Sequence, residues 1–164
     1  MKNIVVIAHN LRSAHNVGSI LRTCEGLGVN TVYLTGYTPH PHYIGDQRLP
    51  HIYNKIGKQI QKTALGSQDA QHWQHFDDVR IIINQLKEQG YCLVALEQSP
   101  GSIKLPEFRW TDKVALLIGR EVDGIESEIL KLCDRIVEIP MFGQKESFNV
   151  AQATAMALYQ LRFY

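Results

Sequence analysis

The strongest constraint on the fold is the order of apolar segments in the first 35 residues. Residues 3–7 form an unbroken run rich in β-branched side chains, which is typical of a strand buried on both faces. Apolar residues then recur at helical spacing from His15 until Gly26 and Gly28 end the pattern, and residues 31–34 form a second strand-like run. A strand, a helix and a strand in this order predict a βαβ unit, and therefore a parallel sheet with a right-handed crossover.

The alternation of strands and helices continues along the chain. Further strands are predicted at residues 73–76, 91–96, 114–118 and 135–139, and further helices at residues 52–62, from Asp77 and Asp78 to Gly90, around residues 125–132, and from Val150 onward. Residues 36–50 are rich in proline and glycine and predict a long loop of a kind that is often functional. Because no internal repeat or linker is apparent, the sequence predicts one α/β domain over residues 1–164.

Composition narrows the class of protein. The formal net charge of +1 gives no overall basic field, so a nucleic-acid partner would have to be held by a local patch. No apolar run approaches the ~20 residues of a membrane-spanning helix, and the N-terminus lacks the apolar core of a signal peptide. We therefore expect a cytoplasmic protein without a membrane anchor.

The cysteines and histidines lack the spacing of a metal site. Cys24, Cys92 and Cys133 are far apart and lie in apolar contexts, which favours core thiols over disulfides or a zinc site. Two histidine pairs, at residues 40–42 and 72–75, have no cysteine or carboxylate at ligand spacing. They are interpreted as surface or packing residues, and no metal is expected.

Three predicted strands end in polar loops that contain glycine or proline, at residues 96–101, 119–124 and 140–149. Because ligands bind at the carboxyl ends of parallel strands, one cleft could collect all three loops. The chain lacks the G-x-x-x-x-G-K-[ST] phosphate loop and the G-x-S-x-G elbow. These absences disfavour nucleoside triphosphates, dinucleotides and serine-hydrolase chemistry.

Three segments resemble the sequence motifs of one enzyme family. Residues 16–23 (NVGSILRT) resemble the first motif, residues 117–125 (LIGREVDGI) the second, and residues 139–151 (IPMFGQKESFNVA) the third motif of the SpoU-type RNA ribose 2′-O-methyltransferases in the SPOUT superfamily. The resemblance covers nearly the whole chain apart from residues 36–76. It implies a parallel α/β sheet flanked by helices, with a C-terminal segment that threads a deep trefoil knot, and a homodimer formed through the C-terminal helix.

The resemblance also implies a reaction, which is the transfer of a methyl group from S-adenosylmethionine (SAM) to a ribose 2′-hydroxyl of RNA. Matched by motif, the cofactor would be held by Leu96, Glu97, Gly119, Ile139 and Phe148, and the catalytic set would be Arg22, Asn16, Glu121, Ser147 and Asn149. Since arginine is a poor base, we expect Arg22 to clamp an RNA phosphate and stabilise the developing alkoxide. Phe148 departs from the leucine usual in the family, which predicts a differently shaped adenine pocket.

The resemblance implies that many members of the family carry an additional RNA-binding domain. We expect none in this chain, so the catalytic domain itself would bind the RNA. The candidate contacts are Arg12, Arg48, Lys55, Lys58 and Lys62. The resemblance to other single-domain members favours tRNA over rRNA as the substrate.

Several of these assignments have a structural alternative. Arg22 lies opposite the apolar stripe of its helix, as a solvated residue would, and Asn149 followed by Gln152 is typical of a capping box. The lysines of residues 55–62 would also fit a solvated helix face. The small residues of the last helix suit either a partner helix in a dimer or a neighbour within the same chain. A noncatalytic RNA-binding dimer, and an α/β enzyme with another small ligand, are the rival functions.

Overall fold

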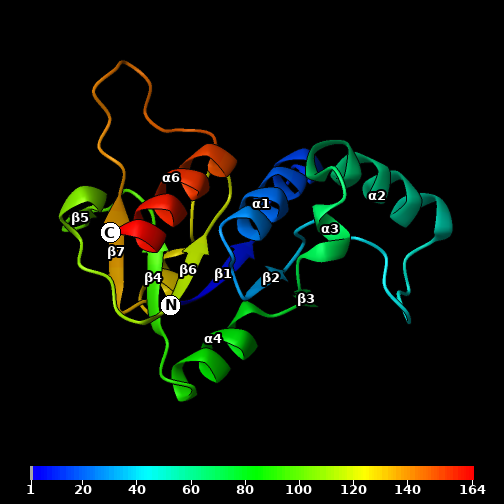
Figure 1. Ribbon diagram of the computed structural model, residues 1–164, viewed down its shortest axis with the longest axis horizontal. Coiled ribbons are helices and arrows are strands. Elements are labelled where there is room, and N and C mark those ends of the chain that lie inside the picture. The colour runs from blue at the N-terminus through cyan, green and yellow to red at the C-terminus, as the bar shows by residue number, and fades with distance from the viewer. Residues whose placement is uncertain (1) are drawn as a thin grey trace.

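The fold is built on a sheet of seven parallel strands (Figure 1). The computed structural model describes residues 2–164. The strands are β1 (Asn3–His9), β2 (Thr31–Thr35), β3 (Trp73–Phe76), β4 (Cys92–Leu96), β5 (Ile103–Lys104), β6 (Lys113–Ile118) and β7 (Arg135–Glu138), in the sheet order β3-β2-β1-β6-β4-β7-β5. Every adjacent pair is parallel, so all strands end at the same edge.

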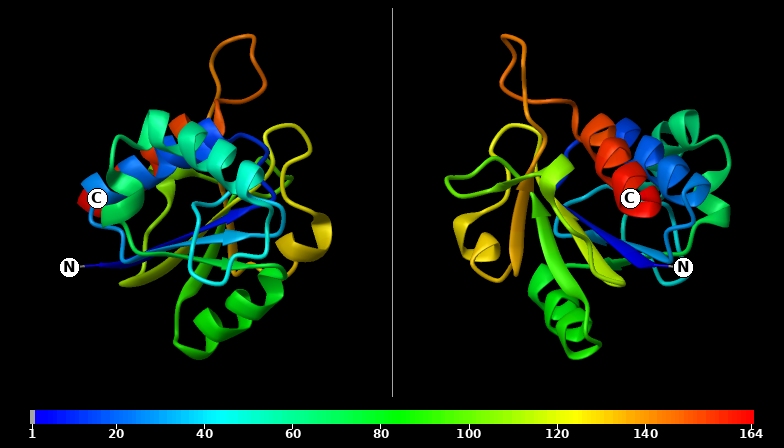
Figure 2. Two further views of the ribbon diagram at one scale, coloured as in Figure 1. Left: turned by 90° about the vertical axis from the view of Figure 1, so that its right-hand side faces the viewer. Right: turned by 60° about the vertical axis from the view of Figure 1, so that its left-hand side comes forward.

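Helices cover both faces of this sheet. The helices are α1 (Ala14–Gly26), α2 (Pro50–Ala64), α3 (Ser67–Ala70), α4 (Val79–Glu88), α5 (Ser127–Leu130) and α6 (Val150–Phe163), and a 3-10 turn, η1 (Leu105–Glu107), precedes β6. Figure 2 shows α1, α2 and α6 on one face and α4 on the other. The parallel α/β class predicted from the sequence is therefore confirmed.

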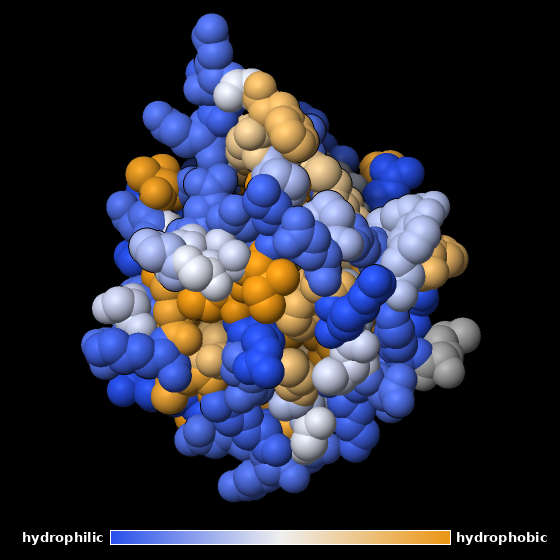
Figure 3. Space-filling view, turned by 90° about the vertical axis from the view of Figure 1, so that its left-hand side faces the viewer, coloured by the Kyte–Doolittle hydropathy of each residue, from blue (hydrophilic) through white to orange (hydrophobic). Residues whose placement is uncertain are grey.

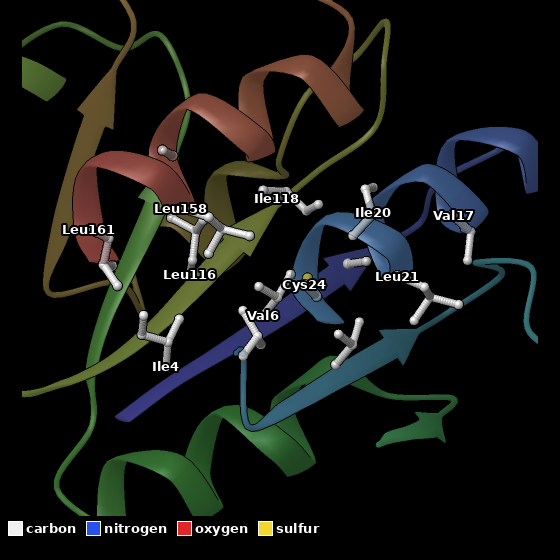
Figure 4. Close-up of a cluster of buried hydrophobic side chains, with 14 of the residues drawn as sticks. Ile4, Val6, Val17, Ile20, Leu21, Cys24, Leu116, Ile118, Leu158 and Leu161 are labelled. Carbon is white, nitrogen blue, oxygen red and sulfur yellow. The ribbon is translucent and has the colours of Figure 1, made fainter. Parts of the chain in front are cut away.

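Two hydrophobic cores form because the strands alternate their side chains between the two faces. In β1, Ile4, Val6 and Ala8 join the core under α1 and α6, and Val5 and Ile7 join the core over α4. Figure 4 shows the first of these cores, with side chains of α1 and α6 pointing onto β1 and β6. Burial on both faces explains why these strands appear in the sequence as continuous apolar runs.

Gly18 allows α1 and α2 to cross closely. A Cβ atom at this position would collide with the hydroxyl of Thr63 and with the backbone carbonyl of Ile60, both on α2. The Thr63 hydroxyl also donates to the carbonyl of His15 at 2.8 Å, which ties the two helices together at this point. The position of α1, which carries the first motif, thus depends on a residue without a side chain.

The small residues of α6 pack inside the chain. Thr154, Ala157, Leu158 and Leu161 are fully buried, and α6 packs beside α1. Of the two alternatives left open by the sequence, a neighbour in the same chain accounts for the small-residue stripe. Threading of the C-terminal segment through a knot stays a prediction.

The cysteines are all free, and only Cys24 is fully buried, where burial raises the pKa of its thiol. Cys92 and Cys133 are partly buried, so the prediction of core thiols holds in full for Cys24 alone. No group of three or more His, Cys, Asp or Glu residues within residues 2–164 is placed to hold a metal ion. In the same residues, none of the helices has the length and apolar character needed to cross a membrane.

Candidate active site

A cavity of about 480 Å³ lies over the carboxyl ends of β4, β6 and β7. These strands are neighbours in the sheet, in the order β6-β4-β7. The loops that follow them, at residues 96–98, 119–124 and 139–148, supply most of the lining. The predicted convergence of three loops on one cleft is therefore confirmed. Figure 1 shows the third loop, in orange, rising from β7 before the chain returns to α6.

The lining of this cavity combines apolar and acidic groups. The apolar lining is Leu96, Ile118, Val122, Ile139, Met141, Phe148, Val150 and Ala153, and the carboxylates are Glu97, Glu121, Glu138 and Glu146. Among the described residues of the lining, the one cation, Arg120, pairs with Glu126 at 3.4 Å. An apolar wall suits an adenine ring, and carboxylates in a partly desolvated cleft favour a cationic sulfonium and ammonium group. The residues present therefore fit SAM. All five positions that the family resemblance assigns to the cofactor line the cavity, namely Leu96, Glu97, Gly119, Ile139 and Phe148.

Glu97 joins the loops that form the cavity. Its carboxylate accepts hydrogen bonds from the backbone N–H groups of Gln98, at 2.8 Å, and Ile125, at 3.0 Å. It occupies the space where a side chain at Gly124 would lie, and Gly124 has a left-handed φ of 67°. The Gln98 side chain then donates to the carbonyl of Glu146 at 2.7 Å. These bonds connect all three loops, so the cavity is formed before any ligand binds.

Three of the predicted catalytic residues form one hydrogen-bonded network at the start of α1. Asn16 donates from Nδ2 to Glu121 Oε1 at 3.0 Å, and Asn149 donates from Nδ2 to Asn16 Oδ1 at 3.2 Å. Burial opposes ionisation of Glu121, but hydrogen bonds from Asn16 and from the backbone N–H of Arg12 outweigh it and hold the pKa of Glu121 below its ordinary value. The network is therefore anchored on a charged carboxylate.

Asn149 has a second contact that is structural. Its Oδ1 accepts the backbone N–H of Ala151 at 2.9 Å, so Asn149 is the N-cap of α6. The predicted cap is confirmed, although Gln152 makes no reciprocal bond within the described part of the chain. One amide side chain thus begins α6 and holds Asn16.

The other two predicted catalytic residues, Ser147 and Arg22, form no side-chain contact of this kind with residues 2–164. Ser147 is exposed and lines the cavity, and its hydroxyl makes no hydrogen bond within residues 2–164. Arg22 is exposed on α1, makes no hydrogen bond or ion pair with the described residues, and does not line the cavity. It lies about 9 Å further along the helix axis than Asn16.

The five residues proposed to bind RNA differ in whether their charged groups are paired with a carboxylate. Lys55, Lys58 and Lys62 are exposed on α2 and share one side of that helix. Arg12 is exposed and lies 3.7 Å from the Asp123 carboxylate. The Arg48 guanidinium pairs with Asp46 at 2.9 Å through Nε and donates to two carbonyls of its own loop, so it braces that loop.

A second polar network was not found from the sequence. His9, at the end of β1, lies 3.3 Å from Glu126, which also accepts from Asn10 at 3.1 Å and pairs with Arg120 at 3.4 Å. Burial is the largest influence on His9 and lowers the pKa of its imidazole. In the sequence, His9 and Asn10 stand where the apolar run of β1 gives way to polar residues, and no pattern links them to Glu126.

The sheet, the cavity over its carboxyl edge and the connecting loops define a class, the α/β proteins that bind a small ligand at the ends of parallel strands. Within that class, this chain belongs to the SpoU rRNA Methylase family, whose model matches residues 3–159. It is an RNA methyltransferase by family.

Individual relatives agree with this placement. The chain is 28% identical to a tRNA (guanosine(18)-2′-O)-methyltransferase of Aquifex aeolicus, over 97% of this chain and 68% of that protein. The structure of an A. aeolicus TrmH/SpoU tRNA modifying enzyme matches with a TM-score of 0.79 and 27% identity, over 99% of this chain and 75% of the other. An AdoMet-bound rRNA methyltransferase from Sinorhizobium meliloti matches with a TM-score of 0.81, over 99% and 57% of the two chains; at 22% identity it shows the fold alone.

Proposed function

We propose that this protein transfers a methyl group from SAM to a ribose 2′-hydroxyl of RNA, with tRNA as the favoured substrate. The observation that carries the proposal is the network of Asn16, Glu121 and Asn149 beside a preformed cavity that fits SAM. The chain spans about two thirds of the length of its A. aeolicus relative, whose name specifies tRNA. An rRNA substrate is the alternative within the same reaction.

The chemistry requires little from the protein beyond position and charge. When bound, SAM supplies an electrophilic methyl group on a sulfonium, and the ribose oxygen must approach it in line and lose its proton. Glu121 orients Asn16, and Asn16 together with Asn149 would hold the ribose at the mouth of the cavity. Ser147, whose hydroxyl is unpaired within the described residues, would contact the ribose or the cofactor from the third loop.

Arg22 would act on the RNA rather than on the cofactor. Its guanidinium stays protonated, is exposed, and lies along α1 beyond Asn16. A phosphate bound there would place the adjoining ribose toward the cavity, and the same positive charge would stabilise the alkoxide as it develops. The exposed lysines of α2 would extend this contact along the RNA backbone.

A homodimer is part of the proposal, and the buried side of α6 leaves only its other side for a partner. Tyr159, Phe163 and Tyr164 are 55%, 61% and 80% exposed, and Met156 is 36% exposed. Large exposed aromatic residues grouped at the end of one helix are typical of an interface. Figure 3 views the side of the molecule on which β5 and β7 lie, where apolar surface gathers near the centre. Light scattering coupled to size-exclusion chromatography of the wild type and Tyr159→Glu would measure the association.

The activity is tested by incubating the purified protein with labelled SAM and undermodified tRNA or rRNA, followed by nucleoside analysis. We expect a 2′-O-methylated nucleoside from tRNA. A methyl group found on a base would refute transfer to the ribose 2′-hydroxyl. A methyl group found on rRNA alone would refute tRNA as the substrate. Tight RNA binding without SAM binding in calorimetry would instead support a noncatalytic module.

The role of Arg22 is tested by Arg22→Ala. We expect loss of methyl transfer while the affinity for SAM stays near that of the wild type, because Arg22 does not line the cavity. Arg80→Ala is the matched control, since Arg80 is also exposed but lies on α4, over the opposite face of the sheet. Unchanged turnover of Arg22→Ala would remove Arg22 from the mechanism.

A further inference from the structure

A second cavity, of about 540 Å³, lies over the other half of the same sheet edge. Its lining comes from the loop at residues 36–48 after β2, from Ile56 of α2, and from His75 and Asp77 at the end of β3. It shares no lining residue with the first cavity. In the left view of Figure 2 this loop, in cyan, lies in front of the ends of β2 and β3 and below α2.

Aromatic rings dominate this second cavity. The His40 ring lies 4.2 Å from His75, 5.6 Å from Tyr43 and 6.1 Å from Trp73, measured between ring centroids. His40 is buried, so the cluster has a packed interior, yet Tyr37 and Tyr43 remain 52% and 43% exposed at its margin. Packing accounts for His40 and Trp73, whereas Tyr37 and Tyr43 keep about half of their surface exposed. Exposed aromatic side chains suit a planar ligand.

The loop that carries these rings is held in place. Arg48 pairs with Asp46 and donates to the carbonyls of His40, at 3.2 Å, and Pro41, at 3.2 Å. The Asp46 carboxylate also accepts the backbone N–H of Arg48 at 3.0 Å, and the guanidinium beside it holds the pKa of Asp46 well below its ordinary value. The cavity therefore exists before a ligand arrives, which lowers the entropic cost of binding.

The donors in the lining, Arg48 and the Gln47 amide, are hydrogen-bonded within the loop, which leaves mainly acceptors for a ligand. His40 Nδ1 lies 3.0 Å from the Pro41 carbonyl and His75 Nε2 lies 3.1 Å from the Gly36 carbonyl, and a carbonyl can only accept, so each of these nitrogens carries the proton. Burial lowers the pKa of His40 to about 4, so at neutral pH its other nitrogen is an acceptor. Asp77 adds a carboxylate at the margin. A ligand edge that donates hydrogen bonds fits this set.

We propose that the second cavity binds an unpaired nucleobase that carries an exocyclic amino group, namely guanine, adenine or cytosine, in the same RNA chain that is methylated. This proposal rests on the proposed function, since it adds a specificity contact to the RNA substrate. Proteins recognise single-stranded RNA by stacking splayed bases on aromatic side chains and bonding their edges. Lys55 is adjacent in sequence to Ile56 of the lining, so the lysine side of α2 begins beside the cavity and can follow the phosphates that lead to it.

Fluorescence provides a direct test, because the chain has only two tryptophans. Trp110→Phe leaves Trp73, which packs against His40 and Tyr43, as the single reporter. Titration with GMP, AMP, CMP and UMP, and with short single-stranded RNAs, should quench Trp73 most for the bases that carry an exocyclic amino group and least for UMP. Asp77→Asn should reduce the difference in Trp73 quenching between UMP and the other mononucleotides, without disturbing the loop at residues 36–48.

A matched pair of variants links the site to RNA binding. Tyr43→Ala should weaken the affinity for the RNA substrate roughly ten-fold, as expected for the loss of one base-stacking contact. Ile44→Ala is the control, because Ile44 is the next residue in the loop, is fully exposed and does not line the cavity. SAM affinity should be the same in both variants.

The outcomes separate this proposal from the proposed function. Methyl transfer with equal RNA affinity in Tyr43→Ala and the wild type overturns the second site and leaves the function intact. Quenching by mononucleotides without any effect of Tyr43→Ala on RNA binding also overturns it, because the site would then serve a free nucleotide. Tyr43-dependent RNA binding without methyl transfer to any RNA supports the site and refutes the proposed function.

Discussion

Alanine substitution at two glycines should have opposite effects on stability. Gly18 of α1 and Gly57 of α2 both lie inside helices, where replacing glycine by alanine normally stabilises by about 1 kcal/mol. A Cβ at Gly57 would meet no atom within 4 Å. A Cβ at Gly18 would meet the backbone carbonyl of Ile60, which cannot rotate away as a flexible side chain would.

The net effect at Gly18 follows from these two contributions. Overpacking typically costs about 1–3 kcal/mol, and a backbone obstacle places Gly18→Ala near ~3 kcal/mol. Subtracting the ~1 kcal/mol gained in helix propensity leaves about 2 kcal/mol of destabilisation. For a chain of this size, that lowers the melting temperature by roughly 4–8 °C, whereas Gly57→Ala should raise it by roughly 2–4 °C.

Thermal and urea denaturation followed by circular dichroism would measure both changes. Gly57→Ala serves as the control for the change in helix propensity, because both substitutions replace glycine by alanine in a helix interior. If Gly18→Ala melted at or above the wild-type temperature, the close crossing of α1 and α2 would be wrong. The placement of Asn16 and Arg22 on α1 would then also need revision.

Two further predictions separate structural from functional roles. Asn149→Ala should lower the free energy of unfolding by about 1 kcal/mol, because the α6 cap is lost, and should also lower turnover. Asn149→Asp keeps a good cap but loses the Nδ2 donor to Asn16, so turnover should fall at nearly constant stability. Equal turnover of Asn149→Asp and the wild type would exclude Asn149 from the site. The pKa of His40 is about 4 in the folded chain, below its ordinary value of 6.5. Between these two pH values the unfolded chain binds a proton at His40 and the folded chain does not. Folding stability therefore falls as the pH drops from about 6.5 to about 4. His40→Gln should reduce the fall in urea midpoint between pH 7 and pH 4.5, and an unchanged fall would assign the pH dependence to other groups.

Long apolar strands and helix caps could be predicted from the sequence because each has a local physical cause. The β-branched run of β1 reflects burial on both faces, and Asn149 caps a helix that begins one residue later. In contrast, β5 has only two residues and is held by pairing with β7, so no periodicity could reveal it. The predicted helix around residues 125–132 contains only one regular turn, Ser127–Leu130.

Side-chain contacts, both local ones and those between distant segments, were the limit for the sites. Arg48 was assigned to RNA from its charge alone, whereas its nearest partner is Asp46, two residues away, and its donors brace the loop. The second cavity draws on residues from 36 to 77, which come together only when the loop closes over β2 and β3. The first cavity could be predicted from the polar loops at three strand ends, because most of its lining falls in those short segments.

Because both cavities lie on the same edge of the sheet, the distance between them is fixed by the sheet. From β2, below the second cavity, to β4, below the first, there are three steps between neighbouring strands, through β1 and β6. At ~4.8 Å for each step, the two strands are about 14 Å apart. A base held at one end and a ribose at the other would lie a fixed, small number of nucleotides apart. Inserting one nucleotide between them would then abolish methylation although both nucleotides were intact, because the protein would select its target by spacing.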